Sequence, residues 1–326
     1  MLATLVRAPR ARAVAALLLG GLMASAAWAE APFAKGNAPG YQRLMLGAFE
    51  ITALSDGTVP LPMDKLLTNT TPEQTRKALA RSYLSSPVET SVNAFLINTG
   101  TKLVLVDTGA GGLFGPTLGK LGASLRAAGY QPEQVDAVLI THMHADHVGG
   151  LIQGADAARA FPNATVHADQ HEADFWLSAA NMAKAPAANQ DFFKAAQATL
   201  KPYVDAGRFK TFDGNTELLP GVRAQASRGH TAGHATYVIE SQGQKLALWG
   251  DLMHVAAVQF ANPAVTIQFD TDSQAAAVQR KQAFADAAKG GYLVAAAHLP
   301  FPGIGHLRVD GKGYDFVPLN YSTITP

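Results

Sequence analysis

The chain contains no cysteine among its 326 residues. This absence excludes disulfide bonds, cysteine nucleophiles and thiolate metal ligands. Charged residues are also scarce, at 16% of the chain, and the formal net charge is only +1, with no long run of lysine or arginine. The charge pattern therefore does not indicate binding to nucleic acid. Its chemistry must come from histidines, carboxylates, hydroxyl groups and metal-bound water.

A run long enough to cross a membrane is missing as well, since the longest apolar stretch, residues 13–26, falls short of the roughly 20 residues required. Three arginines precede it, and Ala27-Trp28-Ala29 has the small-x-small pattern of a cleavage site. We expect residues 1–29 to be a secretory signal peptide that directs the protein to the periplasm or outside the cell. A retained membrane anchor is the alternative. Residues 30–40, rich in Pro, Gly and Ala, are expected to form a flexible leader.

One short run concentrates the metal-binding side chains. Residues 141–147 read Thr-His-Met-His-Ala-Asp-His and directly follow the apolar stretch 135–140. Neutral imidazole and carboxylate are ligands that zinc and similar divalent ions take from proteins. His142, His144, Asp146 and His147 are therefore candidate ligands.

Three further candidates lie downstream, each just after or at the end of a predicted strand. His230 follows the alternating segment 222–226, Asp251 ends the apolar run 246–250, and His298 ends the apolar run 292–297. Loops at the C-terminal ends of strands meet on one rim of a sheet, so we expect these side chains to gather there. Five histidines and two aspartates suit two metal ions about 3.5–4 Å apart that share one carboxylate and one hydroxide.

The order His-x-His-x-Asp-His, followed by Val148-Gly149-Gly150, resembles the signature of the metallo-β-lactamase superfamily. The resemblance implies an α/β fold, an αβ/βα sandwich of two mixed sheets packed face to face with helices outside. It assigns one metal to His142, His144 and His230, the other to Asp146, His147 and His298, and the bridging position to Asp251. Asp146 and Asp251 are the expected catalytic carboxylates. Asp107 is expected to support the metal loop, and His234 to orient a neighbouring ligand.

No interdomain linker follows Gly40, and the candidate ligands come from both halves of the chain. We therefore expect residues 41–326 to form a single hydrolase domain. Within it, Leu44–Leu54 is predicted to form a first strand and Asp156–Ala160 a short helix.

The ligand set predicts metal-dependent hydrolysis. Two divalent cations, with Zn²⁺ expected and Co²⁺, Mn²⁺ or Cd²⁺ as substitutes, lower the pKa of a shared water and polarise a carbonyl or phosphoryl oxygen. The lack of cysteine argues against the cysteine-dependent β-lactamases, and the bridging Asp251 argues against the cysteine-free ones. Glyoxalase-like, lactonase-like and phosphoester-cleaving branches remain.

From about Gly40 onward the chain resembles the methyl parathion hydrolase branch of the superfamily. The matching stretches are 49–57, 113–118, 173–178 and 301–306. The resemblance implies a homodimer and places Phe114, Trp176 and Phe192 in an aromatic substrate pocket. The chain departs from that branch at His254, Ile267 and Phe269, which are expected to wall the leaving-group side of the pocket and are bulkier or more polar here.

These departures predict a hydrolase of aryl esters and lactones, with hydrolysis of organophosphate triesters as a secondary activity. Its partners would be small molecules, without nucleic acid or a stable membrane anchor. Two alternatives stay open. The first is an acyl-homoserine lactone (quorum-signal) lactonase, which needs a channel for an acyl chain. The second is a non-catalytic exported metal-binding protein.

Overall fold

The computed structural model describes residue 33 and residues 38–323. The predicted signal peptide, and most of the predicted leader, lie outside the described residues. Ala38–Pro326 forms one compact unit. No helix within the described ranges is both long and apolar enough to cross a membrane.

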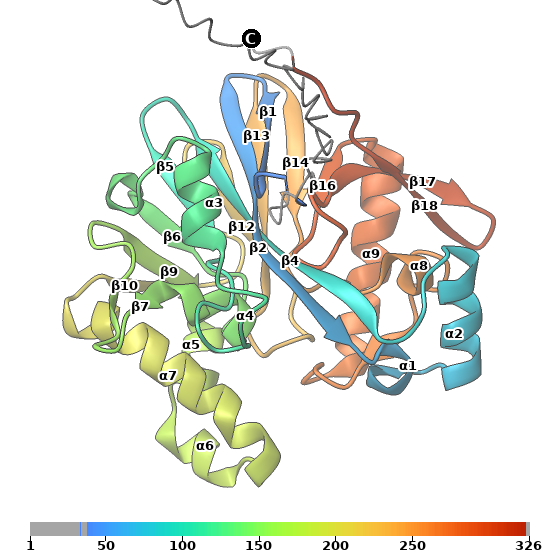
Figure 1. Ribbon diagram of the computed structural model, residues 1–326, viewed down its shortest axis with the longest axis horizontal. Coiled ribbons are helices and arrows are strands. Elements are labelled where there is room, and N and C mark those ends of the chain that lie inside the picture. Colours follow the sequence, from blue (N-terminus) through green and yellow to red (C-terminus); the bar gives the residue numbers. More distant parts are fainter. Residues whose placement is uncertain (1–32, 34–37, 324–326) are drawn as a thin grey trace, which may run out of the picture. The chain divides into compact units, whose positions relative to one another are not determined.

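Two large sheets dominate this unit (Figure 1). The first has the strand order β1 (Tyr41–Leu46), β2 (Phe49–Leu61), β4 (Val88–Asn98), β5 (Leu103–Val106), β6 (Ala137–Leu139), β9 (Thr165–Asp169) and β10 (Phe209–Phe212). The second has the order β11 (Glu217–Leu219), β12 (Val222–Ala226), β13 (Ala235–Ser241), β14 (Gln244–Leu248), β16 (Leu293–Ala295), β17 (Ile304–Asp310) and β18 (Gly313–Pro318).

Both sheets are mixed. In the first, β1, β2, β4 and β5 pair antiparallel, whereas β5, β6, β9 and β10 pair parallel. In the second, β14 and β16 are parallel and the other neighbours are antiparallel. Parallel strands end at the same edge of a sheet. Three of the four ligand-bearing segments follow strands of these parallel pairs, namely β6, β14 and β16.

The two sheets pack on each other through one apolar cluster. Its buried side chains alternate along the strands of both sheets, for example Ile97 and Val104 from the first and Tyr237 and Leu248 from the second. The Tyr237 hydroxyl crosses the interface and donates to the Ile140 carbonyl at 2.7 Å. This bond ties the second sheet to the end of β6, immediately before the metal-binding motif.

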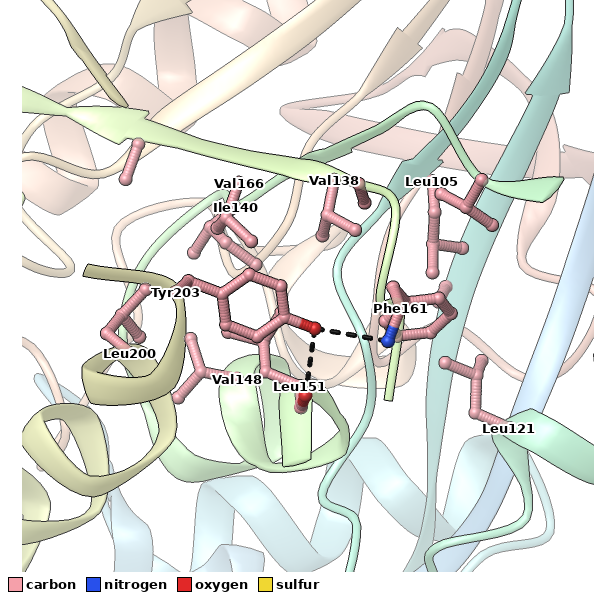
Figure 2. Close-up of a cluster of buried hydrophobic side chains, with 14 of the residues drawn as sticks. Leu105, Leu121, Val138, Ile140, Val148, Leu151, Phe161, Val166, Leu200 and Tyr203 are labelled. Atoms are coloured by element: carbon pink, nitrogen blue, oxygen red, sulfur yellow. Dashed lines mark hydrogen bonds between the residues drawn. The ribbon is translucent and has the colours of Figure 1, made fainter. Parts of the chain in front are cut away.

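Helices cover the outer faces. On the first sheet lie α3 (Leu121–Ala127) and α7 (Gln190–Asp205), and on the second lies α9 (Ser273–Gly290), whose Phe284 is buried against Trp249. Figure 2 shows the cluster beneath α7, where the buried Tyr203 hydroxyl donates to the Leu151 carbonyl at 3.0 Å and accepts from the Phe161 N–H at 3.1 Å. Val148, which follows His147 directly, packs in the same cluster. The helix/sheet/sheet/helix layering confirms the predicted αβ/βα sandwich.

The shorter elements connect these layers. The helices are α1 (Met63–Leu66), α2 (Pro72–Arg81), α4 (Ala145–Val148), α5 (Gln170–Trp176), α6 (Ala179–Lys184) and α8 (Ala256–Gln259), with 3₁₀ turns η1 (Pro132–Gln134), η2 (Gly149–Leu151) and η3 (Ala187–Asn189). Two small ribbons pair β3 (Leu67–Thr68) with β15 (Thr266–Ile267) and β7 (Ile152–Gln153) with β8 (Ala158–Arg159).

Two local predictions were wrong. Leu44–Leu54 is not one strand but the hairpin of β1 and β2, which turns at Gly47 with φ of 59°. A Cβ at Gly47 would lie 2.4 Å from the Ser241 carbonyl oxygen, so only glycine fits this turn. Asp156–Ala160 is a turn running into β8 rather than a helix. Five residues are too few for an isolated helix to form without tertiary support.

Candidate metal centre

The predicted ligands lie together at the ends of strands, as their sequence positions indicate. His142 and His144 follow β6, and Asp146 and His147 stand in the short helix α4. His230 follows β12, Asp251 follows β14 and His298 follows β16. Both sheets therefore contribute to one cluster, and the loops between strand ends bring its side chains into contact.

The first trio converges through one nitrogen of each imidazole. His144 Nδ1 lies 3.0 Å from His142 Nε2 and 3.1 Å from His230 Nε2. Two nitrogens bound to one tetrahedral zinc at about 2.0–2.1 Å would lie roughly 3.3 Å apart. The three nitrogens are thus spaced as ligands of a single ion, and all three side chains are buried.

The second trio lies beside the first and shares Asp251 with it. Asp146 Oδ2 is 3.7 Å from His147 Nε2 and 3.5 Å from His298 Nε2. Asp251 Oδ2 lies 3.4 Å from His230 Nε2 and 3.1 Å from His298 Nε2, and its Oδ1 lies 3.1 Å from His147 Nε2. The carboxylate therefore lies between the trios and contacts histidines of both, which is the position a bridging ligand requires.

Several imidazoles are oriented through the nitrogen that faces away from the cluster. His147 Nδ1 lies 2.8 Å from Asp107 Oδ2, His230 Nδ1 lies 2.8 Å from Asp270 Oδ1, and His298 Nδ1 lies 2.8 Å from the Ser91 carbonyl oxygen. Such outer partners determine the tautomer and leave the inner nitrogen free for a metal. No sequence signal marks Asp270, which is 40 residues from His230 and reaches it only through folding.

The carboxylates control the protonation of the cluster. Burial alone would lower the pKa of His147, but Asp251, Asp146 and Asp107 outweigh it and raise this pKa well above its ordinary range. Burial likewise opposes protonation of His230, yet its hydrogen bonds with Asp251 and Asp270 raise its pKa to about 9. Burial would raise the pKa of Asp251, but the surrounding imidazoles hold it well below its usual value. The cluster thus offers anionic oxygen and protons that a cation can displace.

His254 is an additional polar group at the centre. Its Nε2 lies 3.2 Å from Asp251 Oδ2, and its ring stacks on that of His298 with centroids 5.2 Å apart. Neither ring nitrogen has a hydrogen-bond partner in the described part of the chain, although the side chain is buried. Burial lowers the pKa of His254 to about 4, so the ring is neutral near pH 7. His254, Asp251 and His298 also lie close enough together for one atom of each to bind the same metal ion.

These donors fit metal ions. Besides His254, the buried atoms without a hydrogen-bond partner among the described residues include His147 Nε2 and Asp251 Oδ1, which face each other. Buried polar atoms are rarely left unpaired, and each such case needs an explanation. Cations in the two trios would satisfy both atoms. One ion would be held by the first trio and the other ion by the second trio. Asp251 would bind both ions.

An apolar chamber of about 110 Å³ opens directly onto the cluster. We call it the inner chamber; its lining includes Asp146, His254, Phe114, Phe192 and Phe269. A larger outer chamber of about 530 Å³ adjoins it and shares His144, Phe192 and Phe269 with its wall. Trp176 lines this outer chamber.

One predicted pocket residue lies elsewhere. Ile267 is only 1% exposed and packs in a separate apolar cluster with Met63, Leu67 and Val265. It lines neither chamber within the described residues. In β15, Ile267 pairs with Leu67 of β3. The neighbouring Phe269 is the residue that reaches the inner chamber.

Comparison with known proteins agrees with this geometry. The model of the metallo-beta-lactamase superfamily matches residues 87–298, more than half of the chain. The chain belongs to the metallo-beta-lactamase superfamily. The crystal structure of the hydrolase AbOPH in the beta lactamase superfamily is 38% identical, with a TM-score of 0.84, and the match covers 88% of this chain and all of that one.

A second superfamily member of known structure is also similar over nearly its whole length. AidC, a dizinc quorum-quenching lactonase solved with its product N-hexanoyl-L-homoserine, is 26% identical, with a TM-score of 0.81, over 87% of this chain and 99% of AidC. This chain, too, is a metal-dependent hydrolase of the superfamily, with a His/Asp cluster suited to a dinuclear site.

Curated relatives match over shorter stretches. An N-acyl homoserine lactonase from a Bacillus species is 24% identical over 156 residues, and an atrochrysone carboxyl ACP thioesterase from Passalora fulva is 27% identical over 157 residues. Each match covers 48% of this chain, but only 53% of the lactonase and 36% of the thioesterase. The chain thus spans about half or less of the length of these relatives.

Proposed function

We propose that this superfamily member hydrolyses aryl esters and aryl lactones, with organophosphate triesters as secondary substrates, as in the methyl parathion hydrolase branch. The observation that carries the proposal is the inner chamber. Its aromatic walls, Phe114, Phe192 and Phe269, line the same cavity as the carboxylates of Asp146 and Asp251. A flat aryl group would bury apolar surface there while its scissile bond reaches the cluster.

Two bound divalent cations, zinc in our proposal, would supply Lewis acidity and a water of lowered pKa. The chain's own residues then divide the work. Asp251 orients both trios through its two oxygens. Asp146 has a side chain that is 20% exposed and lines the inner chamber, so its carboxylate is placed to take a proton from the attacking water and pass it to the leaving oxygen.

His254 has a separate role in this proposal. Because its ring is neutral near pH 7, one ring nitrogen carries a hydrogen that it can donate to a carbonyl or lactone oxygen. Its position in the wall of the inner chamber, next to Asp251, supports this role. A phosphotriester with bulky alkoxy groups would gain less from this contact than a planar lactone.

A substrate panel tests the proposal. Dihydrocoumarin, aryl acetates, acyl-homoserine lactones, a β-lactam and methyl paraoxon would be compared by kcat/KM on the same metal-loaded protein. We expect dihydrocoumarin and aryl acetates to rank first and methyl paraoxon to be turned over measurably. Hydrolysis of the β-lactam alone, or of none of the panel, would refute it.

The outer chamber favours a second candidate function, that of an acyl-homoserine lactonase. Its walls include Phe175, Trp176, Ala185 and Pro186, so it offers the apolar space that an acyl chain needs beyond the metal centre. The similarity to AidC supports the same reading. Kinetics on acyl-homoserine lactones of increasing chain length separate the candidates. A kcat/KM that rises with chain length and exceeds that on dihydrocoumarin would favour the quorum-signal lactonase.

We also propose that the protein is exported to the periplasm, with a mature chain beginning near Glu30, and that it forms a homodimer. The arginine-rich start, apolar stretch and small-x-small site support export. N-terminal sequencing from the native host tests processing, and an intact Met1 would refute it. Light scattering during size-exclusion chromatography tests the dimer.

A further inference from the structure

Glu172 is a buried carboxylate that the proposed chemistry does not use. It stands in α5, its side chain is fully buried, and it is not among the seven candidate ligands. Its Oε1 accepts from the backbone N–H of Met143 at 2.8 Å. Its Oε2 accepts from the Thr231 hydroxyl and from the Gly233 N–H, both at 2.8 Å.

The two oxygens therefore bind two different ligand loops. Met143 lies between His142 and His144, whereas Thr231 and Gly233 lie one and three residues after His230. These three histidines are the whole histidine set of the first trio. The loops belong to opposite sheets, since one follows β6 and the other follows β12. Glu172 joins them across the gap between the sheets.

Burial of the Glu172 carboxylate is unfavourable for its charged form. Burial raises the pKa of Glu172, while the donors at Met143, Thr231 and Gly233 act against that rise. Burying a charge without such partners is strongly unfavourable. The loop also comes unusually close to α5, because a Cβ on Gly233 would lie 2.2 Å from the Glu172 backbone nitrogen. This close contact leaves little freedom in the distance between the loop that contains Gly233 and helix α5.

We propose that Glu172 is a positioning residue for the first trio, holding His142 and His144 at metal-binding distance from His230. Metal affinity depends on ligands that are already in place, because any ordering left to the binding step weakens it. Asp146, His147 and His298 donate no hydrogen bond to Glu172, whose donors are Met143, Thr231 and Gly233. Loss of the carboxylate should therefore weaken one metal site far more than the other. The inference rests on the proposed dinuclear centre.

The Glu172→Gln substitution tests this with little change in shape. The amide oxygen of glutamine can accept from only one of the two loops. The amide nitrogen then faces the backbone N–H of Met143 or of Gly233, which can only donate and loses its acceptor, so one of the two ties between the loops is broken. Asp56→Asn is the matched control. Asp56 is equally buried and accepts three backbone N–H donors, those of Ala110, Gly119 and Leu121, but it bonds neither ligand loop.

The measurement is Zn²⁺ binding to the metal-free full-length chain, by competition with a chromophoric chelator, alongside the melting temperature. Paramagnetically shifted imidazole N–H signals of the Co²⁺-loaded protein identify the site, since the first trio contributes three histidines and the second two. We expect Glu172→Gln to weaken the three-histidine site at least tenfold and the other less than about threefold. Asp56→Asn should lower the melting temperature but leave both affinities unchanged.

Different failures have different meanings. A wild-type chain that binds no metal would overturn both the proposed function and this inference. The inference alone would be overturned if both metal sites of Glu172→Gln kept their wild-type affinities. It would also be overturned if Glu172→Gln weakened both sites equally and Asp56→Asn weakened them to the same extent. If Glu172→Gln does not fold, Thr231→Val removes one of the three donors and keeps the carboxylate. It should weaken the same site by a smaller factor, and unchanged affinity there would also overturn the inference.

Discussion

The backbone N–H of Asp251 donates a hydrogen bond to Nε2 of His234 at 3.1 Å. Burial lowers the pKa of His234 to about 3, so the ring stays neutral and this nitrogen stays an acceptor. Its Nδ1 lies 2.7 Å from the Ser227 hydroxyl oxygen, which completes the pairing of the ring. His234 thus orients the backbone of Asp251, the carboxylate proposed to bridge the two metals, and is not itself one of the seven candidate ligands.

Gly250, the residue before Asp251, should not tolerate a side chain. Its φ is +55°, and a Cβ would lie 2.8 Å from Thr141 Cβ and 2.9 Å from His234 Nε2. Gly250→Ala should lower the free energy of unfolding by roughly 1–3 kcal/mol and weaken metal binding. Gly243→Ala is the control, because Gly243 has a similar φ of +78° with open space around it. Equal metal affinity in both variants would contradict the role given to this backbone.

Asp251→Ala should remove nearly all hydrolysis of every substrate. The change deletes the carboxylate between the two trios and leaves excess positive charge there when metals bind. Steady-state kinetics on dihydrocoumarin and methyl paraoxon provide the check. Retention of more than about a tenth of wild-type turnover, about 1.4 kcal/mol of barrier, would mean that Asp251 is not the bridge.

His254→Leu should shift activity toward phosphotriesters. The change replaces a hydrogen-bond donor in the inner chamber with apolar surface, which favours methyl paraoxon over dihydrocoumarin. We expect the ratio of their kcat/KM values to change about tenfold, which needs only about 1.4 kcal/mol of differential transition-state binding. Metal content is measured on both proteins as the control. An unchanged ratio with intact metal content would exclude His254 from the substrate pocket.

Metal binding should release protons near neutral pH. The carboxylates of the cluster raise the pKa of His147 well above its ordinary range and that of His230 to about 9. Near neutral pH both imidazoles therefore hold an additional proton in the metal-free chain, His230 up to about pH 9, and a cation must displace these protons. Calorimetry of Zn²⁺ binding in buffers of different ionisation enthalpy, at pH 7.5, should give more than one proton released per chain. Release should decline as the pH is raised past 9, and a pH-independent value near zero would contradict this electrostatic picture.

The proximity of the seven candidate ligands could be predicted from the sequence because these residues follow local rules. His142, His144, Asp146 and His147 form one contiguous motif, and each of the other three lies just past a strand. The residues that hold those ligands follow no such rule. Glu172 and Asp270 reach the centre only when α5 and the loop before α9 pack against it, so no spacing along the chain marks them.

The pocket was harder to predict than the metal centre. Phe114, Phe192, His254 and Phe269 do meet at the inner chamber, whereas Ile267 is buried in another cluster. Closeness to Asp251 along the chain does not determine which side chains line the chamber. The pairing of β15 with β3 keeps Ile267 out of it, because this pairing places Ile267 against Leu67.

The most direct test of the central claim is the metal content of the purified protein, measured together with its activity. Elemental analysis of protein prepared without chelator should approach two equivalents of divalent metal per chain, most of it zinc. Chelation should abolish hydrolysis of dihydrocoumarin, and activity should return fully only as the second equivalent is restored. Full activity at a reproducible single equivalent, or after complete removal of metal, would contradict a dinuclear centre bridged by Asp251.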